Sequence, residues 1–371
     1  MNPWSSLILS FIMSSLVLGH SYSNEGINMA AEKPRTLFFS FGDSLIDVGN
    51  NNYLTYCLAK SNFPWYGMDY NGGIPTGRFT NGRTIIDIVA EKLGLDSSPA
   101  YLSLSNTSDD TVMLKGVNYA SGGAGILDET GLLFIEKIPF DNQIDHFQAT
   151  KKSLTKKIGA VAAENLLNEA IYFVVIGSND YINNYLLPVN VTNAQQQTPH
   201  QFKVLLITSL REQFKRIYQL GARKILFNGI GPLGCIPAQR AKNGGACLED
   251  VNRWVQKFNV NIQKLLSELN SELPGVKINY VDSYSGVMKL IQNPGAYGFS
   301  VSDTPCCNVD TNFGQLCLPN SNVCSDRSQY VFWDAFHPTD AANVVLADMF
   351  ISKPGTLQFI SPSPAPAPAP Y

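Results

Sequence analysis

The sequence predicts a doubly wound α/β domain, in which a parallel sheet of about five strands carries helices on both faces. Short runs rich in apolar and β-branched residues alternate along the chain with longer segments of helical period. The runs are apolar over most of their length, which is typical of buried strands. The intervening segments are long enough for the crossover helices that parallel strands require.

The five expected strands follow one another from the start of the domain to its last third. Each ends near a glycine, a serine or a polar residue, where a turn begins. Because the carboxyl ends of parallel strands meet at one edge of a sheet, the residues after these strands are expected to converge. The strands are expected at 36–42, 116–121, 171–177, 224–230 and 276–282.

The helices expected between these strands are recognised by their apolar faces and their ends. In the segment 199–220, Phe202, Leu206 and Leu210 share one face, and Gly221 suits the position that follows a helix. A Pro-Gly pair ends the next helix in the same way. Helices are expected at 83–95, 142–168, 199–220 and 250–273, with a further helix close to the carboxyl end.

Both ends of the chain are expected to lie outside the fold. Residues 5–18 form an apolar segment of the length of a signal-peptide core, and small residues suit cleavage after Ser23. We therefore expect a signal peptide at 1–23 and a single hydrolase-sized domain at 34–355. The Pro/Ala-rich segment 361–371 is expected to be a disordered tail. Secretion follows, although a vacuolar destination would use the same signal.

The composition limits the partners of the processed chain. The 371 residues carry a net charge of -3, and only 15% of them are charged, so there is no basic field to hold nucleic acid. No later apolar run reaches the length of a transmembrane helix, so no membrane anchor is expected after signal removal. The oligomeric state is not predicted.

Seven cysteines suit an oxidising compartment. Cys235 and Cys247 flank a short loop, and a second segment holds four more, at 306, 307, 317 and 324, so three disulfides are expected and Cys57 is left over. Zinc is the alternative for the group of four, but no C-x2-C pair occurs there. The N-x-[ST] sequons at Asn106 and Asn190 are expected glycosylation sites in a secreted chain.

Three of the expected strand ends carry unusual side chains or loops. Ser44 follows the first strand, a glycine-rich loop with Gly122 and Gly123 follows the second, and Asn179 follows the third. Ser44 is a candidate nucleophile, although a serine at this place also suits a turn or a helix cap. A glycine amide of the Gly122–Gly123 pair, the Ser44 amide and the Asn179 side chain are suitable donors to an oxyanion.

A serine nucleophile needs a base, and the chain has only four histidines. His337 lies in FWDAFHPTD, where Asp334 is three residues away and Pro338 keeps the histidine backbone extended. Asp334 can then reach Nδ1 while Nε2 points outward. The simpler alternative is that this segment only caps the final helix near Thr339.

The sequence as a whole resembles the plant-type GDSL esterase/lipase family of the SGNH hydrolase superfamily. FGDSLIDVGNNNY, GVNYASGGAGI, VIGSNDY and FWDAFHPT resemble the four blocks of that family, in the same order and over nearly the whole domain. The resemblance implies a three-layer α/β/α sandwich with a flavodoxin-like parallel sheet. It also implies Ser44 as the nucleophile, His337 as the base and Asp334 as its acidic partner, with Ser44, Gly123 and Asn179 as oxyanion donors.

These residues predict a serine hydrolase that cleaves carboxylic esters of lipids or other acyl groups through an acyl-enzyme. Neither a Walker A sequence nor H-E-x-x-H occurs, and no cofactor or metal is expected. Two alternatives remain open. The same residues would serve an acyltransferase that passes the acyl group to an alcohol on a lipid or cell-wall polymer. A secreted binding glycoprotein would keep the fold without turnover.

Overall fold

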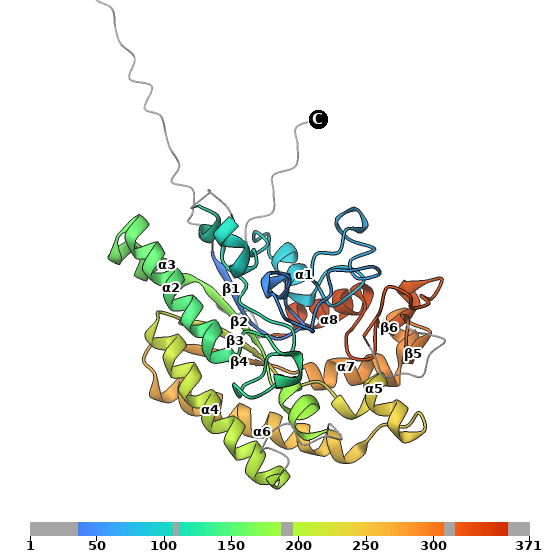
Figure 1. Cartoon of the computed structure of the whole chain (residues 1–371). Coiled ribbons are helices and arrows are strands. Elements are labelled where there is room, and N and C mark those ends of the chain that lie inside the picture. The colour runs from blue at the N-terminus through green and yellow to red at the C-terminus, as the bar shows by residue number, and fades with distance from the viewer. Residues whose placement is uncertain (1–35, 107–110, 187–195, 308–315, 355–371) are drawn as a thin grey trace, which may run out of the picture. The chain divides into compact units, whose positions relative to one another are not determined.

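A computed structural model describes residues 36–106, 111–186, 196–307 and 316–354 (Figure 1). Its main sheet has four parallel strands in the spatial order β1, β2, β3, β4. The register pairs the last residues of neighbouring strands, so all four carboxyl ends lie at one edge. The strands are β1 (Phe38–Gly42), β2 (Ile171–Val175), β3 (Lys224–Asn228) and β4 (Lys277–Val281).

The segment 116–121, expected as a fifth strand, runs parallel to β1 without becoming a regular strand. Tyr119 N–H donates to Ser40 O at 2.8 Å, as in a parallel ladder. The other side of the segment meets an irregular loop, where Asn118 bridges to Ala100 instead of to another strand. The segment therefore occupies the place of a fifth strand beside β1, but it has only one strand neighbour.

Helices cover both faces of the sheet, which confirms the predicted α/β class and its three layers (Figure 1). On one face lie α2 (Phe140–Ile158), α3 (Ala160–Glu169), α4 (Pro199–Gln219) and α6 (Glu249–Glu272). On the other lie α1 (Ile85–Lys92) and α8 (Asp340–Ser352). The short α5 (Pro237–Arg240) and α7 (Ser283–Gln292) follow β3 and β4.

Two smaller sets of elements lie outside these layers. A second sheet pairs β5 (Val301–Pro305) with β6 (Tyr330–Phe332). One-turn 3-10 helices lie in the connections, at Asn50–Tyr53, Asn71–Gly73, Tyr101–Asn106, Val112–Lys115, Leu132–Phe134, Leu233–Cys235, Ala241–Asn243, Pro294–Tyr297 and Arg327–Gln329, and a π-helical turn lies at Asp180–Tyr185.

The two cores follow from the pleat of the strands. Phe39 and Phe41 of β1 pack against the α2, α4 and α6 side, whereas Phe38 packs against the α1 and α8 side. In β2, Tyr172 and Phe173 divide in the same way. Because both faces are buried, the strands are apolar at consecutive positions, and this is why their sequences were recognisable.

One expected helix is divided in two. The segment 142–168 was expected to be continuous, but α2 ends at Ile158 and α3 begins at Ala160. Gly159 between them has φ +85°, a left-handed value that glycine adopts without steric cost and that a helix interior does not allow. The helices α4 and α6 begin and end within one residue of the expected bounds.

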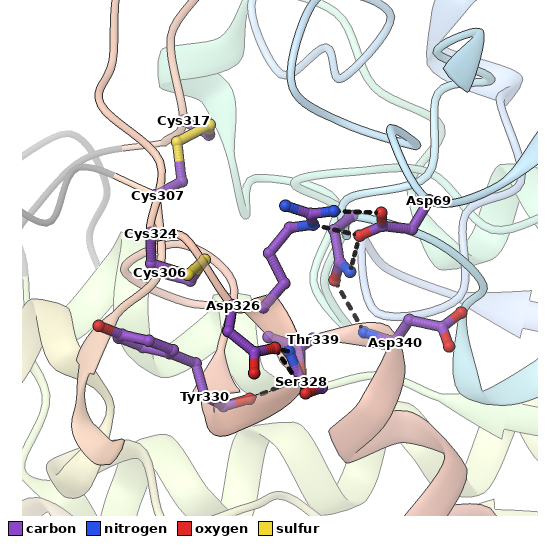
Figure 2. Close-up of a disulfide and its surroundings, with 12 residues drawn as sticks. Asp69, Cys306, Cys307, Cys317, Cys324, Asp326, Ser328, Tyr330, Thr339 and Asp340 are labelled. Carbon is purple, nitrogen blue, oxygen red and sulfur yellow. Dashed lines mark hydrogen bonds and ion pairs between the residues drawn. A yellow bond between two sulfur atoms is a disulfide. The ribbon is translucent and has the colours of Figure 1, made fainter. Parts of the chain in front are cut away.

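Three disulfides form as expected from the cysteine spacing. Cys235 is bonded to Cys247, Cys306 to Cys324 and Cys307 to Cys317. Figure 2 shows the last two bridges next to each other, with Asp69 beside them. The Asp69 carboxylate accepts two hydrogen bonds from Arg327, at 2.6 and 2.7 Å, which joins the loop before α1 to this disulfide segment.

Cys57 is buried and unbridged, as the odd cysteine count predicted. Among the described residues, no group of three or more His, Cys, Asp or Glu side chains is placed to hold a metal ion. No described helix combines the length and the apolar character of a membrane span.

Several expectations fall outside the described residues. They are the signal peptide 1–23, the tail 361–371 and the sequon at Asn190. Asn106 ends a 3-10 helix, and its side chain is outside what is described. The domain bounds 34–355 and both glycosylation sites therefore stay predictions.

Candidate active site

Ser44 lies in the turn directly after β1, as the sequence predicted. Gly42 ends the strand, and a Cβ there would lie 2.1 Å from Val175 O, so only glycine allows β1 and β2 to end this close together. Gln143 of α2 accepts from Gly42 N–H and donates to Gly42 O, both at 2.8 Å. The chain then turns at Asp43, whose carbonyl accepts from the amide of Asp47 at 3.0 Å. This fixed turn places the Ser44 hydroxyl at the carboxyl edge of the sheet.

His337 and Asp334 lie in the loop between β6 and α8. Asp334 Oδ1 accepts hydrogen bonds from the backbone amides of Phe336 and His337, both at 2.9 Å, so the carboxylate holds its own loop closed. Thr339 caps α8 by accepting from Ala342 N–H at 3.1 Å. The capping interpretation of this segment is therefore correct, but it does not occupy the histidine ring.

The ring of His337 joins Ser44 to Asp334. Nε2 lies 2.8 Å from Ser44 Oγ, and Nδ1 lies 2.8 Å from both carboxylate oxygens of Asp334. Asp334 is fully buried and His337 is 5% exposed. Because the carboxylate accepts from Nδ1–H, the neutral ring presents an unprotonated Nε2 to the serine hydroxyl. The side chains are thus placed for the transfer of the Ser44 proton to His337.

Tyr66 is a member of this site that the sequence did not reveal. Its hydroxyl donates to Asp334 Oδ2 at 2.7 Å and accepts from Cys317 N–H at 3.2 Å. Tyr66 is fully buried, and burial, together with the neighbouring Asp334 carboxylate, holds its pKa well above the ordinary value for tyrosine. The phenol therefore remains a hydrogen-bond donor to Asp334 and positions that carboxylate from the side opposite to the imidazole.

The glycine loop after 116–121 is held by two buried carboxylates. Asp47 Oδ2 accepts from Gly122 N–H at 3.0 Å, and Asp180 accepts from Ile126 N–H at 2.8 Å. No described residue accepts from the amide of Gly123, which has φ +83° and lines the cavity. Of the two glycines, Gly123 is therefore the one whose N–H is free for a ligand. Burial raises the pKa of Asp47 and of Asp180 to about 6, against the hydrogen bonds that they accept.

The amide of Asn179 is fixed in one orientation by two neighbours. Its Oδ1 accepts from Asn183 Nδ2 at 2.9 Å, and its own Nδ2 donates to Ala124 O at 3.0 Å. One hydrogen on Nδ2 remains, and Asn179 lines the same cavity as Ser44 and Gly123. Asn183 is thus a second positioning residue that the sequence did not reveal, and it leaves Asn179 as a donor to the cavity.

A cavity of about 750 Å³ brings these groups together. Its wall contains Ser44, His337, Gly123 and Asn179, and most of the rest is apolar. The size and the apolar lining are those of sites for small organic molecules. The predicted residues Ser44, His337, Gly123 and Asn179 all meet here, whereas Asp334 lies behind the imidazole and does not line the cavity.

Asp43, next to Ser44, carries a buried carboxyl that is 1% exposed. Oδ1 accepts from Leu45 N–H at 3.0 Å, but Oδ2 has no hydrogen-bond partner in the described part of the chain. Burial raises the pKa of Asp43 to about 7, while the Leu45 amide and His337 lower it and Asp180 raises it further. The folded protein therefore holds this proton at pH values where an unfolded aspartate has lost it.

The sign of the resulting pH dependence follows from linkage. Because the folded-state pKa of Asp43 exceeds the ordinary value of 3.8, this group makes the protein less stable as pH rises from about 4 to about 7. The variant Asp43→Asn keeps an oxygen for Leu45 and has no charge to bury. We expect its free energy of unfolding to equal that of the wild type at pH 4.5 and to exceed it at pH 8 by about 1 to 3 kcal/mol. Urea unfolding at both pH values measures this, and an equal difference at both would contradict it.

The fold and this site together define a class of protein. A serine, an imidazole and a carboxylate hydrogen-bonded in series, at the edge of an α/β sheet and beside free N–H donors, is the arrangement of serine hydrolases. The comparison with known families agrees. The chain belongs to the GDSL-like lipase/acylhydrolase family, which matches residues 38–350. This confirms the family and the enzyme class, a carboxylic ester hydrolase, that the sequence predicted.

Individual relatives match over most of their length. GDSL esterase/lipase At5g37690 of Arabidopsis thaliana is 54% identical over 88% of this chain and 90% of its own. GDSL esterase/lipase At1g74460 of the same plant is 44% identical over 85% of this chain and 86% of its own. Among solved structures, an acetyl xylan esterase is similar with a TM-score of 0.37 and 11% identity, covering 85% of this chain and 98% of that one, which is too distant to inform the substrate.

Proposed function

We propose that this chain is a secreted serine hydrolase that cleaves carboxylic esters through an acyl-enzyme. The observation that carries the proposal is the series Ser44, His337 and Asp334, with 2.8 Å contacts on both ring nitrogens. This series lies at the wall of an apolar cavity large enough for an acyl group. A binding protein would need the cavity but not a base beside the serine.

In the proposed reaction, Ser44 Oγ attacks the ester carbonyl carbon while His337 Nε2 accepts the hydroxyl proton. Asp334 keeps the Nδ1–H bond and stabilises the imidazolium that forms. The carbonyl oxygen becomes an oxyanion, which accepts from the amides of Ser44 and Gly123 and from Asn179 Nδ2. When the tetrahedral intermediate collapses, the alcohol leaves with the proton from His337. Water then repeats the sequence on the acyl-enzyme, releasing the acid and restoring Ser44.

Secretion is proposed from the amino-terminal segment and supported by the disulfides. Residues 1–23 have the pattern of a signal peptide. Three disulfides form and persist in oxidising compartments such as the secretory pathway and the cell exterior. The mature enzyme would meet its ester substrate there.

The test is covalent labelling with a fluorophosphonate ester. The disulfide-bonded protein should gain the mass of one phosphonyl group per chain, with loss of fluoride, and peptide mapping should place it on Ser44. The matched control is His337→Gln, which keeps the serine but removes the base and should label at least about a hundredfold more slowly. A folded chain that takes no adduct, or takes it on another residue, would overturn the proposed mechanism.

A further inference from the structure

The candidate cavity extends well beyond the groups that the proposed reaction uses. Its wall contains residues at the ends of all four main strands: Ser44 follows β1, Val175 ends β2, Asn228 ends β3 and Val281 ends β4. Neighbouring strands lie about 4.8 Å apart, so the cavity crosses roughly 14 Å of the sheet edge. Most of this length lies beyond Ser44 on the β4 side.

One face of α8 forms a wall along the same direction. The lining residues recur at spacings of three and four, which places them on one side of the helix: Asn343, Leu346, Met349, Phe350 and, just after the helix, Lys353. The rise from the first to the last is about 15 Å. Because His337 lies just before α8, this wall begins beside the imidazole and leads away from it.

The facing wall comes from α7, where a glycine leaves room. Gly286 and Val287 line the cavity, and a Cβ on Gly286 would lie 3.3 Å from Leu346 Cδ2 and 4.0 Å from Met349 Sδ. Glycine inside a helix is unfavourable compared with alanine, so its place in α7 asks for a reason outside the helix. The missing side chain keeps the two walls apart at this point.

The side chains along this passage are apolar, and the charged group stands at its far end. Val281, Val287, Leu346, Met349 and Phe350 form the walls, whereas Lys353 follows the last turn of α8. An occupant with many hydroxyl groups would find no partners along such walls and would lose hydrogen bonds to water. A hydrocarbon chain has no such groups to satisfy.

We propose that the α7–α8 groove, formed by Val281, Gly286, Val287, Leu346, Met349 and Phe350, holds the acyl chain of the substrate. The substrate class is then esters of unbranched fatty acids, with about 10 to 14 carbons accommodated over the 15 Å from the imidazole to the end of α8. This inference rests on the proposed function, because Ser44 fixes where the ester carbonyl lies. Gly286 is the residue that keeps the groove open to long chains.

The experiment measures kcat/KM for p-nitrophenyl esters from acetate to hexadecanoate with the full secreted protein. In the wild type, kcat/KM should rise with acyl length up to about dodecanoate. In Gly286→Leu, the ratio of kcat/KM for dodecanoate to that for acetate should fall tenfold or more, because each methylene kept out of the groove forfeits roughly a fourfold gain. Lys289→Leu adds the same side chain to an exposed position of α7 and should leave the ratio unchanged.

A second pair of variants covers the case in which Gly286→Leu does not fold. Met349→Phe narrows the groove from the α8 side and should lower the same ratio, whereas Leu346→Ala widens it and should move the preferred acyl length upward. Thermal unfolding of each variant shows that the ratio is read on folded protein.

The outcomes separate this proposal from the one on which it rests. A wild type that hydrolyses no ester, acetate included, would overturn the proposed function and the groove with it. An active wild type whose length preference is unchanged in both narrowing variants would overturn the groove alone. A parallel series of acetate esters with alcohols of increasing length gives the third outcome: a loss in Gly286→Leu that follows alcohol length would assign the groove to the alcohol and overturn the acyl assignment.

Discussion

Replacing Ser44 with alanine is expected to lower kcat/KM for ester hydrolysis by about 10⁴-fold or more. The substitution removes the oxygen that would form the acyl-enzyme, and the oxyanion donors that remain cannot supply a covalent route. The fold should be kept, because the hydroxyl is bonded to His337 Nε2 and ends no helix or strand. Initial rates with p-nitrophenyl acetate, with circular dichroism spectra and melting temperature for the fold, measure both expectations.

The matched control for this variant is a second serine of the same segment. Ser40 lies within β1, is fully buried, and its hydroxyl has no hydrogen-bond partner among the residues described. Ser40→Ala removes the same atom four residues earlier and should leave both the rate and the fold unchanged. Wild-type turnover in Ser44→Ala would exclude the proposed nucleophile, and an equal loss in Ser40→Ala would attribute the effect to packing of the strand.

The placement of Ser44 and Asn179 was predictable because it needs only local patterns and one rule of topology. Their strands are apolar at consecutive positions, which marks them as buried on both faces. Parallel strands share a carboxyl edge, so polar residues that follow different strands meet there. His337 was predictable by a different route, since Asp334 is three residues away and a single loop holds both.

The divided helix illustrates where local patterns fail. The segment around Gly159 keeps a helical spacing of apolar residues on both sides, with Leu154 before it and Ala163 and Leu167 after it in the same core. Apolar period alone therefore predicts one helix across 142–168. The backbone at Gly159 turns because α2 and α3 each pack separately, and a tertiary reason of this kind leaves no mark except the glycine itself.

Tyr66 and the groove were beyond prediction because they depend on contacts between distant segments. Tyr66 and Asp334 are 268 residues apart, and no spacing rule joins a tyrosine in an irregular loop to that carboxylate. The Gly123 assignment is similar, since the occupied amide of Gly122 is explained only by Asp47. The open space at Gly286 depends on how α7 and α8 approach each other, which neither helix determines alone.

Replacing Asp334 with asparagine is expected to lower kcat by roughly 10³ to 10⁴-fold, with little change in KM. The Asp334 carboxylate accepts from donors only: two backbone amides of its own loop, Tyr66 O–H and His337 Nδ1–H. An asparagine has one acceptor oxygen and one NH₂ group, so a donor must then face a donor. The change that relieves the conflict puts the ring proton on Nε2 of His337, and that nitrogen can no longer accept from Ser44.

Tyr66→Phe provides the graded comparison, because it removes one donor and leaves the carboxylate and the tautomer of His337 unchanged. We expect kcat to fall only about three- to tenfold, again with little change in KM, since the ring is still held by Nδ1 while one support of Asp334 is lost. Steady-state kinetics of the two variants with one ester measure this order. An Asp334→Asn enzyme that keeps more than a tenth of wild-type kcat would contradict the role given to the carboxylate. A Tyr66→Phe enzyme altered in KM but not in kcat would assign Tyr66 to substrate binding, because support of Asp334 acts on the proton transfer and therefore on kcat.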